Sequence, residues 1–253
     1  MKLQEYKTNT LKQFIDLYPH PPKRLSSAGN KKIGIGTISF SSLSTHGTCA
    51  GKTQICDAMC YDATGRSVMF GNLAPRVWYE KHLLEDISKL KEIIEAEIVL
   101  YNNGAVRLKV GGDFGSEAEI NMWVEILKNF PQVEFWGYTR AWRVKELAVP
   151  IARLRDQPNM MLLASVDAQT GFPDDYVQKG KTSGWRLAYM GDAPAAPNSK
   201  DVVCPEIEGK VNSCRQCNLC IGKNFSVGIR FPLHGNQKGH YEKILAEGTK
   251  NNG

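Results

Sequence analysis

The chain has 253 residues, enough for one full-sized hydrophobic core or for one domain with a small appendage. Hydrophobic residues make up 42% of it and charged residues 23%, a balance that excludes a largely disordered chain. The formal net charge of +6 suits an acidic or nucleic-acid partner, but the basic residues are spread out rather than massed and give that partner little support.

No segment has the pattern of a membrane span or of a signal peptide. The longest apolar runs, such as residues 160–166, are far too short to cross a bilayer. Residues 1–14 are polar and amphipathic and lack an apolar signal core. We therefore expect a cytosolic protein with no membrane partner. In a reducing compartment, clustered cysteines more often hold metal than form disulfides.

The first half of the chain alternates strand and helix patterns. Residues 1–30 predict a lead-in rather than a domain, and the alternating pattern of residues 31–40 predicts a strand. After a cysteine-containing loop, residues 75–98 predict a long helix that starts at proline. Residues 105–112 then predict a strand that stops at a double glycine.

The second half continues the alternation and ends in a cysteine-rich segment. The expected elements are a helix over 116–130 capped by Ser116, a strand over 132–139, a helix over 142–156 bent at Pro150, strands over 159–167 and 184–190, a linker over 193–200 and a strand over 225–231. This order predicts an α/β fold, a partial (β/α) barrel-like parallel sheet with a C-terminal cysteine-rich extension. The expected divisions are 1–30, 31–192 and 193–253.

Four cysteines gather near the C-terminus, and we name them the four-cysteine group: Cys204, Cys214, Cys217 and Cys220. Four thiolates with two-residue gaps suit tetrahedral zinc or an iron–sulfur cluster. Zinc sites more often use paired Cys-x2-Cys units on two separate turns. The spacing therefore favours a [4Fe–4S] cluster, with zinc as the alternative.

The other three cysteines form a second set, the three-cysteine group: Cys49, Cys56 and Cys60. Three ligands leave a tetrahedral ion or one iron of a cluster with a vacant position where a substrate or cofactor can bind. His46 either completes a closed four-ligand site or is a surface loop residue. The sequence also leaves open whether the two groups meet in space and share ligands.

Three residues at the end of the second expected strand, Gly111, Gly112 and Asp113, have two readings. Two glycines let a ligand approach the backbone, and the acid can accept a hydrogen bond from an amine. Gly-Gly-Asp is equally good as a turn. Farther along, Arg140 could bind a carboxylate or phosphate or pair with an acid, and Asp167 could cap a turn or act as a base.

The order of strand, three cysteines, helix, strand, Gly-Gly-acid, helix and strand resembles the radical S-adenosylmethionine (SAM) superfamily. This resemblance implies that the three-cysteine group holds a [4Fe–4S] cluster with SAM on its open iron. It also implies that Gly111, Gly112 and Asp113 hold the amino group of SAM and that Ser165 meets its ribose. The four-cysteine group resembles the auxiliary clusters of some members. The cysteine gaps, six and three residues, differ from the family's three and two.

A second resemblance covers most of the chain and rests on the motifs "CYDATGR", "GGDFGSEAEINMW", "YTRAW" and "CRQCNLC". The sequence is similar to a family of small uncharacterised phage- and plasmid-borne proteins. This likeness implies a viral origin, hence the host cytosol, and cysteines that are metal or cluster ligands, but no activity.

Three functions are compatible with these patterns. The first is a redox [4Fe–4S] protein with one or two clusters, using radical-SAM-like chemistry if it is an enzyme and supplied by an electron donor of the host. The second is a zinc-stapled module that binds nucleic acid or protein without catalysis. The third is a structural virion component that carries a cluster.

Overall fold

The computed structural model describes residues 9–28, 33, 37–44, 48–63, 65–102, 104–178, 183–222, 226–233 and 241. His46 lies outside the described residues, as does most of the expected strand over 31–40 that precedes Thr37. In the described part of the chain no helix is long and apolar enough to cross a membrane.

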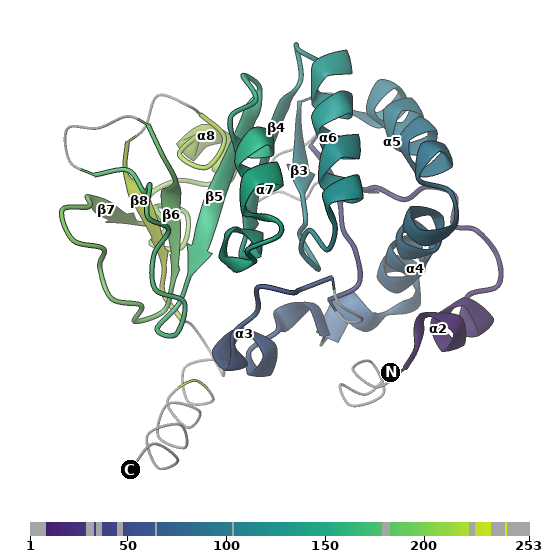
Figure 1. Cartoon of the computed structure of the whole chain (residues 1–253), viewed down its shortest axis with the longest axis horizontal. Helices are drawn as coiled ribbons and strands as arrows, with labels where there is room; N and C mark the ends of the chain where they lie inside the picture. The colour runs from purple at the N-terminus through teal and green to yellow at the C-terminus, as the bar shows by residue number, and fades with distance from the viewer. Residues whose placement is uncertain are drawn as a thin grey trace.

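One sheet of eight strands forms the centre of the molecule, in the order β1-β2-β3-β4-β5-β6-β8-β7 (Figure 1). The strands are β1 Ser27–Ala28, β2 Ile38–Phe40, β3 Ala105–Leu108, β4 Glu134–Thr139, β5 Met160–Val166, β6 Arg186–Met190, β7 Asp201–Val203 and β8 Gly228–Phe231. Only the pairing of β1 with β2 is antiparallel. From β2 to β6 the parallel strands follow chain order, as in a (β/α) barrel, but the sheet is open. The α/β prediction is confirmed.

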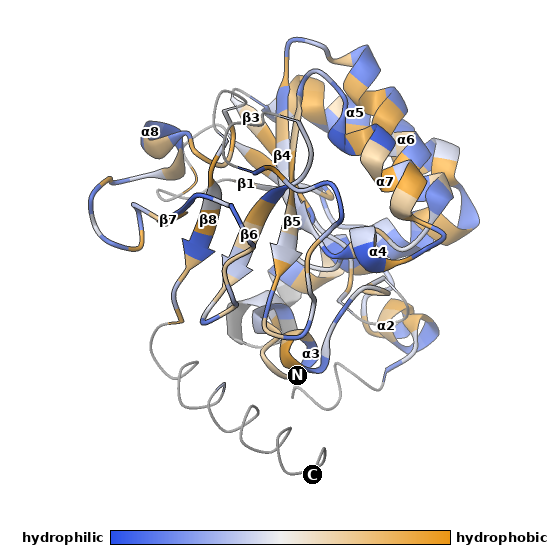
Figure 2. Cartoon of the chain, turned by 60° about the vertical axis from the view of Figure 1, so that its left-hand side comes forward, coloured by the Kyte–Doolittle hydropathy of each residue, from blue (hydrophilic) through white to orange (hydrophobic). Residues whose placement is uncertain are grey.

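The helices of the described residues are α2 Leu11–Leu17, α3 Gln54–Ala58, α4 Phe70–Glu85, α5 Ile87–Tyr101, α6 Glu117–Asn129, α7 Ala148–Arg155 and α8 Cys214–Cys217, with 3-10 turns η1 Tyr61–Ala63, η2 Gly65–Val68 and η3 Ala141–Arg143. Of these, α5, α6 and α7 cover one face of the sheet (Figure 2). Figure 2 shows α5, α6 and α7 on one side of the sheet and α8 on the other. Apolar residues of α5, α6 and α7, such as Ile94, Trp123 and Ile151, are buried in the main core cluster. Right-handed crossovers between parallel strands place successive helices on the same side.

The strand alternation sorts the core into two clusters. In β5, Met160, Leu162 and Ala164 pack among the helices, in the cluster that also holds Trp123 of α6. The intervening Met161 and Leu163 face the opposite way and pack with Trp136 of β4 and with Cys204 and Cys220. Because side chains alternate along a strand, one apolar run serves both faces. We name the second side the cysteine face.

The expected helix over 75–98 is wrong in its extent, because two helices occupy this region. Asp86 ends α4 and caps α5, its carboxylate accepting a hydrogen bond from the Lys89 amide at 2.9 Å. A capping aspartate competes with the helix for backbone donors and breaks it. Pro75 lies inside α4 rather than at its start.

The expected helix over 142–156 is also shorter than predicted. Residues 141–143 form η3, and α7 begins only at Ala148. Pro150 therefore lies in the first turn of α7, where its missing N–H needs no partner, rather than at a bend. By contrast α6 is confirmed, with the Ser116 hydroxyl accepting from the Glu119 amide at 3.2 Å.

The strand expected over 105–112 ends at Leu108. Lys109 has a φ of 53°, in the left-handed region, and this turn of the backbone sends its side chain toward the helices instead of the cysteine face. Lys109 and Val110 therefore lie between the end of β3 and the double glycine.

Described residues of the lead-in and of the C-terminal extension contribute to the sheet and its packing. In the lead-in, α2 buries Phe14 in a cluster with Leu73 and Val77 of α4, and β1 pairs with β2. In the C-terminal extension, β8 pairs with β6, while Ala193 and Ala196 of the expected linker are buried in the main core. The domain divisions at 30/31 and 192/193 stay predictions.

Candidate functional site

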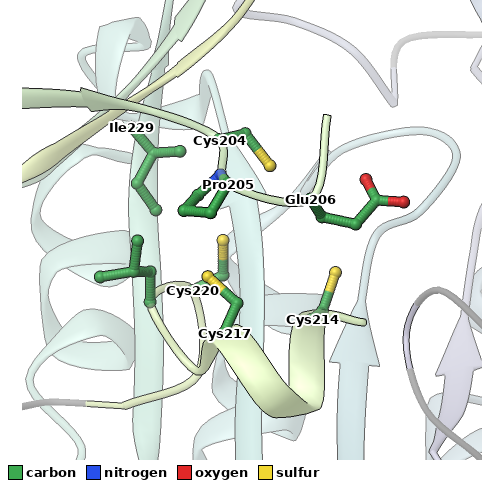
Figure 3. Close-up of a pocket in the computed structure, with 8 residues that line it drawn as sticks. Cys204, Pro205, Glu206, Cys214, Cys217, Cys220 and Ile229 are labelled. Atoms are coloured by element: carbon green, nitrogen blue, oxygen red, sulfur yellow. The ribbon is translucent and has the colours of Figure 1, made fainter. Parts of the chain in front are cut away.

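The four cysteines of the C-terminal group come from two segments that meet on the cysteine face. Cys204 follows β7, and its amide extends the ladder by donating to the Arg230 carbonyl at 2.8 Å. Cys214 and Cys217 stand on the single turn α8. In Figure 3 the four sulfur atoms lie around one hollow, with Pro205, Glu206 and Ile229 on its walls.

Caps at both ends of α8 determine the path of the second segment, which carries Cys214, Cys217 and Cys220. Ser213 caps α8, its hydroxyl accepting from the Gln216 amide at 3.2 Å. Asn218 then ends the turn in the left-handed conformation, with a φ of 57°. Asparagine tolerates this conformation better than most residues. The reversal returns the chain to the sheet, where Cys220 is buried.

All four thiols of the group line this hollow, which is partly open to solvent. In the described part of the chain no three histidine, cysteine, aspartate or glutamate side chains are placed so that they could hold one metal ion.

Two residues that the sequence analysis missed fix the cysteine loop to the sheet. Buried Arg186 of β6 donates to the backbone carbonyls of Leu219 at 2.8 Å, Val227 at 3.1 Å and Gly222 at 3.4 Å. The Tyr138 hydroxyl of β4 donates to the Cys220 sulfur at 3.0 Å. A charged residue inside the apolar strand over 184–190 was the signal that could have revealed the first of them.

None of the seven cysteines, all of which the structure describes, forms a disulfide. Burial raises the pKa of Cys220 to about 12, although the Tyr138 hydrogen bond opposes this rise. Burial, and secondarily the Asp113 carboxylate, raises the pKa of Cys49 above its ordinary value, and burial raises that of Cys56. Reactive cysteines have lowered pKa values, so covalent catalysis by these thiols is disfavoured. A metal that binds them must displace their protons.

The three-cysteine group lies at a different place, at the carboxyl ends of the strands. Figures 1 and 2 both show α3, which carries Cys56, at the opposite end of the sheet from α8. The three thiols are near enough to act electrostatically on one another. Asp113 and Arg140 also act on Cys56, the first raising and the second lowering its pKa. The two groups therefore form two separate sites.

The loop that carries the three cysteines is pinned across the ends of β4 and β5. The Thr53 hydroxyl donates to the Asp167 carboxylate at 2.6 Å, and the Ile55 amide donates to the Gln169 side chain at 3.0 Å. Arg143 donates to the Gly51 carbonyl at 2.8 Å. These contacts join residues about 90 to 115 positions apart, so the sequence pattern could not reveal them.

Arg140 and Asp167 pair with each other, at 3.2 Å between Nη2 and Oδ2. Asp167 also accepts from the Gln169 amide at 2.8 Å, which is the capping role expected for it. Asp113 accepts from the Thr139 hydroxyl at 2.6 Å and from two backbone amides. The carboxylates at this edge thus fasten one strand end to the next.

The glycines of the Gly-Gly-Asp turn are already in close contact with the chain itself. A side chain at Gly111 would collide with the Asp62 carboxylate, and one at Gly112 with the Ser42 hydroxyl. At Ser165 the backbone carbonyl accepts from the Trp142 indole at 3.3 Å. The expected contacts of SAM with Gly111, Gly112, Asp113 and Ser165 stay a prediction.

Gly112 supports a prediction with a matched control. Gly112→Ala is expected to lower the free energy of unfolding by about 3 kcal/mol, because the new methyl group meets both a φ of +72° and the Ser42 hydroxyl. Gly171→Ala introduces the same methyl group at a φ of +67° with nothing within 4 Å, so about 1 kcal/mol is expected. Urea unfolding of both variants measures the difference, and equal losses would show that the Ser42 contact is unimportant.

Comparisons with known proteins agree with the phage likeness. A family model described as Gene product 88 matches residues 19–223. The chain is 26% identical over 220 residues to a Gene 88 protein of Mycobacterium phage L5, covering 78% of this chain and 87% of that protein. It is 28% identical over 134 residues to a Gene 88 protein of Mycobacterium phage D29, covering 48% of this chain and 52% of that protein. No solved structure matches. The expected relation to a phage-borne family is confirmed.

Proposed function

The chain belongs to the Gene product 88 family, and we propose that it is an iron–sulfur protein whose four-cysteine group holds a [4Fe–4S] cluster. The observation that carries the proposal is the convergence of Cys204 with the Cys214–Cys220 segment around one hollow (Figure 3). Nine residues lie between Cys204 and Cys214 in the sequence, and the pairing of β7 with β8 fixes Cys204 at the edge of the sheet.

The donor set supports a cluster. Thiolates are the usual ligands of iron–sulfur clusters, and four of them complete a cubane. All four thiols of the group line the same hollow. Leu219 and Ile229 supply apolar walls that limit water at the site. Bound there, a [4Fe–4S] cluster supplies one-electron transfer.

The residues of the chain hold and shield this site. Arg186 fixes the loop through three backbone carbonyls, which keeps Cys220 against the sheet. The Tyr138 hydroxyl donates a hydrogen bond to the Cys220 sulfur. This bond stabilises the negative charge of the sulfur when the thiol is ionised. Burial, and next the negative charge of Cys220, raises the pKa of Tyr138 well above its ordinary value, so the hydroxyl keeps its proton. The proposed partner is a host protein that donates electrons.

A second cluster at the three-cysteine group is part of the same proposal. Cys49, Cys56 and Cys60 would leave one coordination position vacant, which suits a small ligand. The group lies at the carboxyl ends of the strands, where α/β proteins bind their ligands. Thr53 and Arg143 hold the loop there from both sides. No step of the proposal depends on SAM.

Metal and sulfide analysis tests the proposal. The protein is purified anaerobically, and iron, zinc and acid-labile sulfide are measured per chain. About eight irons and eight sulfides are expected for two cubanes, and about four of each if only the four-cysteine group is filled. Zinc without sulfide would overturn the proposal and leave the zinc-stapled binding module. A cluster that no reductant can reduce would instead favour a structural virion component.

A further inference from the structure

Tyr138 is the hydroxyl-bearing side chain of the sheet that reaches a sulfur of the four-cysteine group. Its oxygen lies 3.0 Å from the Cys220 sulfur, and the residue is the fifth of the six residues of β4. The two residues are 82 positions apart in the chain. A contact made across such a separation depends on the fold and not on local chain geometry.

The ring of Tyr138 is held firmly in place. It meets the Trp136 ring edge-on, at 5.8 Å between centroids, and the Phe231 ring in the same manner, at 5.6 Å. The Arg107 guanidinium carbon lies 5.6 Å from its centre. A ring fixed on three sides cannot swing its hydroxyl away, so the hydrogen bond to Cys220 is preorganised.

The direction of the hydrogen bond determines its effect on a cluster. A donor to a ligand sulfur stabilises negative charge, and the reduced cluster carries one more negative charge than the oxidised one. The same bond is therefore stronger in the reduced state. The cationic Arg186 guanidinium attracts the Cys220 thiolate. It therefore also favours the more negative, reduced state of the cluster.

Given the [4Fe–4S] cluster proposed above, on which this step rests, we propose that Tyr138 is a positioning residue that raises the reduction potential of the four-cysteine centre. The centre then accepts an electron from a donor that could not reduce it without the hydroxyl. The electron enters the cluster, and the Tyr138 proton stays on its oxygen throughout. The role assigned to this centre is that of electron acceptor.

The test compares Tyr138→Phe with wild-type protein and with Tyr176→Phe. Tyr138→Phe removes one oxygen atom and leaves the packed ring, and its reduction equilibrium is expected to shift about tenfold toward the oxidised state, or 59 mV for one electron. Tyr176 is the matched control, because its hydroxyl donates to the Pro197 carbonyl at 2.9 Å. Tyr176→Phe is expected to keep the wild-type potential. Redox titrations followed by visible absorption and electron paramagnetic resonance measure all three.

The outcomes separate this inference from the proposed function. Wild-type iron and sulfide with an unchanged potential in Tyr138→Phe would overturn the role of Tyr138 and leave the cluster standing. Absence of sulfide from the wild-type protein would overturn both. If Tyr138→Phe loses its iron, a ring-fluorinated tyrosine at this position provides the second variant. Its stronger donor must raise the potential, and an unchanged or lowered value would overturn the inference.

Discussion

Cys214→Ser protein is expected to lose about four irons per chain and about 4 kcal/mol of the free energy of unfolding. The four-cysteine group joins α8 to the segment after β7, and a bound cluster would link them covalently in the folded state alone. A ligand that binds only the folded state stabilises it. The loss corresponds to a fall of about 10 °C in the melting temperature. Iron analysis and anaerobic thermal unfolding measure the two effects.

The matched control is Cys56→Ser, the same exchange in the other group. It leaves the four-cysteine group intact, so the irons of that centre and its absorption are expected to remain. Because α3 and α8 lie at opposite ends of the sheet, the two variants should act independently (Figure 1). If Cys56→Ser alone removed all the iron, the seven cysteines would serve one site, contrary to the separate placement of α3 and α8. If Cys214→Ser kept all its iron, the four-cysteine proposal would be wrong.

The order of elements could be predicted because it is recorded locally in the sequence. Hydrophobic periodicity and the Ser116 cap are sufficient to place α6, and the apolar run of β5 identifies a buried strand. Because parallel strands joined by helices have a fixed handedness, the alternation alone indicates an α/β sheet with its helices on one face. The spacing of the cysteines divides them into two groups along the chain, but the separation of α3 from α8 is visible only in the fold (Figure 1).

Several features of the fold and of the site could not be predicted from the sequence. They depend on single residues that make contacts far along the chain or that adopt a backbone conformation unusual for their type. Asp86 divides one helical pattern into two by capping, although periodicity runs through it. The φ of Lys109 reverses the side on which its side chain emerges, which no alternation rule anticipates. Tyr138 and Arg186 read as ordinary strand residues until the cysteine loop is seen against them. The pins of the three-cysteine loop, such as Thr53 on Asp167, are equally invisible in the sequence.

The reversed side chain of Lys109 is the basis of the second large prediction. Its ammonium group pairs with Glu119 of α6 and donates to the Ser42 hydroxyl at 2.9 Å, with both charged side chains almost fully buried. Glu119 is further satisfied by the Tyr79 hydroxyl at 2.7 Å and the Gly115 amide at 3.1 Å. This network anchors the backbone between β3 and the Gly-Gly-Asp turn to α6. It therefore positions the strand end beside the three-cysteine loop.

Lys109→Met is expected to lower the free energy of unfolding by about 3 to 5 kcal/mol, because it leaves the Glu119 carboxylate buried without its cation. The control is Lys91→Met, which breaks the partly exposed Lys91–Glu95 pair on α5, and about 0.5 kcal/mol is expected there. The double variant Lys109→Met with Glu119→Gln removes both charges and should recover part of the loss. Urea unfolding of the four proteins measures the coupling between the two side chains.

The decrease in the free energy of unfolding that Lys109→Met causes must also depend on pH. Burial raises the pKa of the neighbouring Glu80 from 4.5 to about 7, against the lowering effect of Lys109, so removal of Lys109 raises it further. A carboxyl group whose pKa is raised by folding keeps a proton that the unfolded chain releases. The free energy of unfolding therefore falls as pH rises from about 4.5 to the folded-state pKa. The deficit of Lys109→Met relative to wild type should accordingly be larger at pH 8 than at pH 5. A deficit independent of pH would show that lost packing, rather than the uncompensated carboxylates, destabilises the strand end.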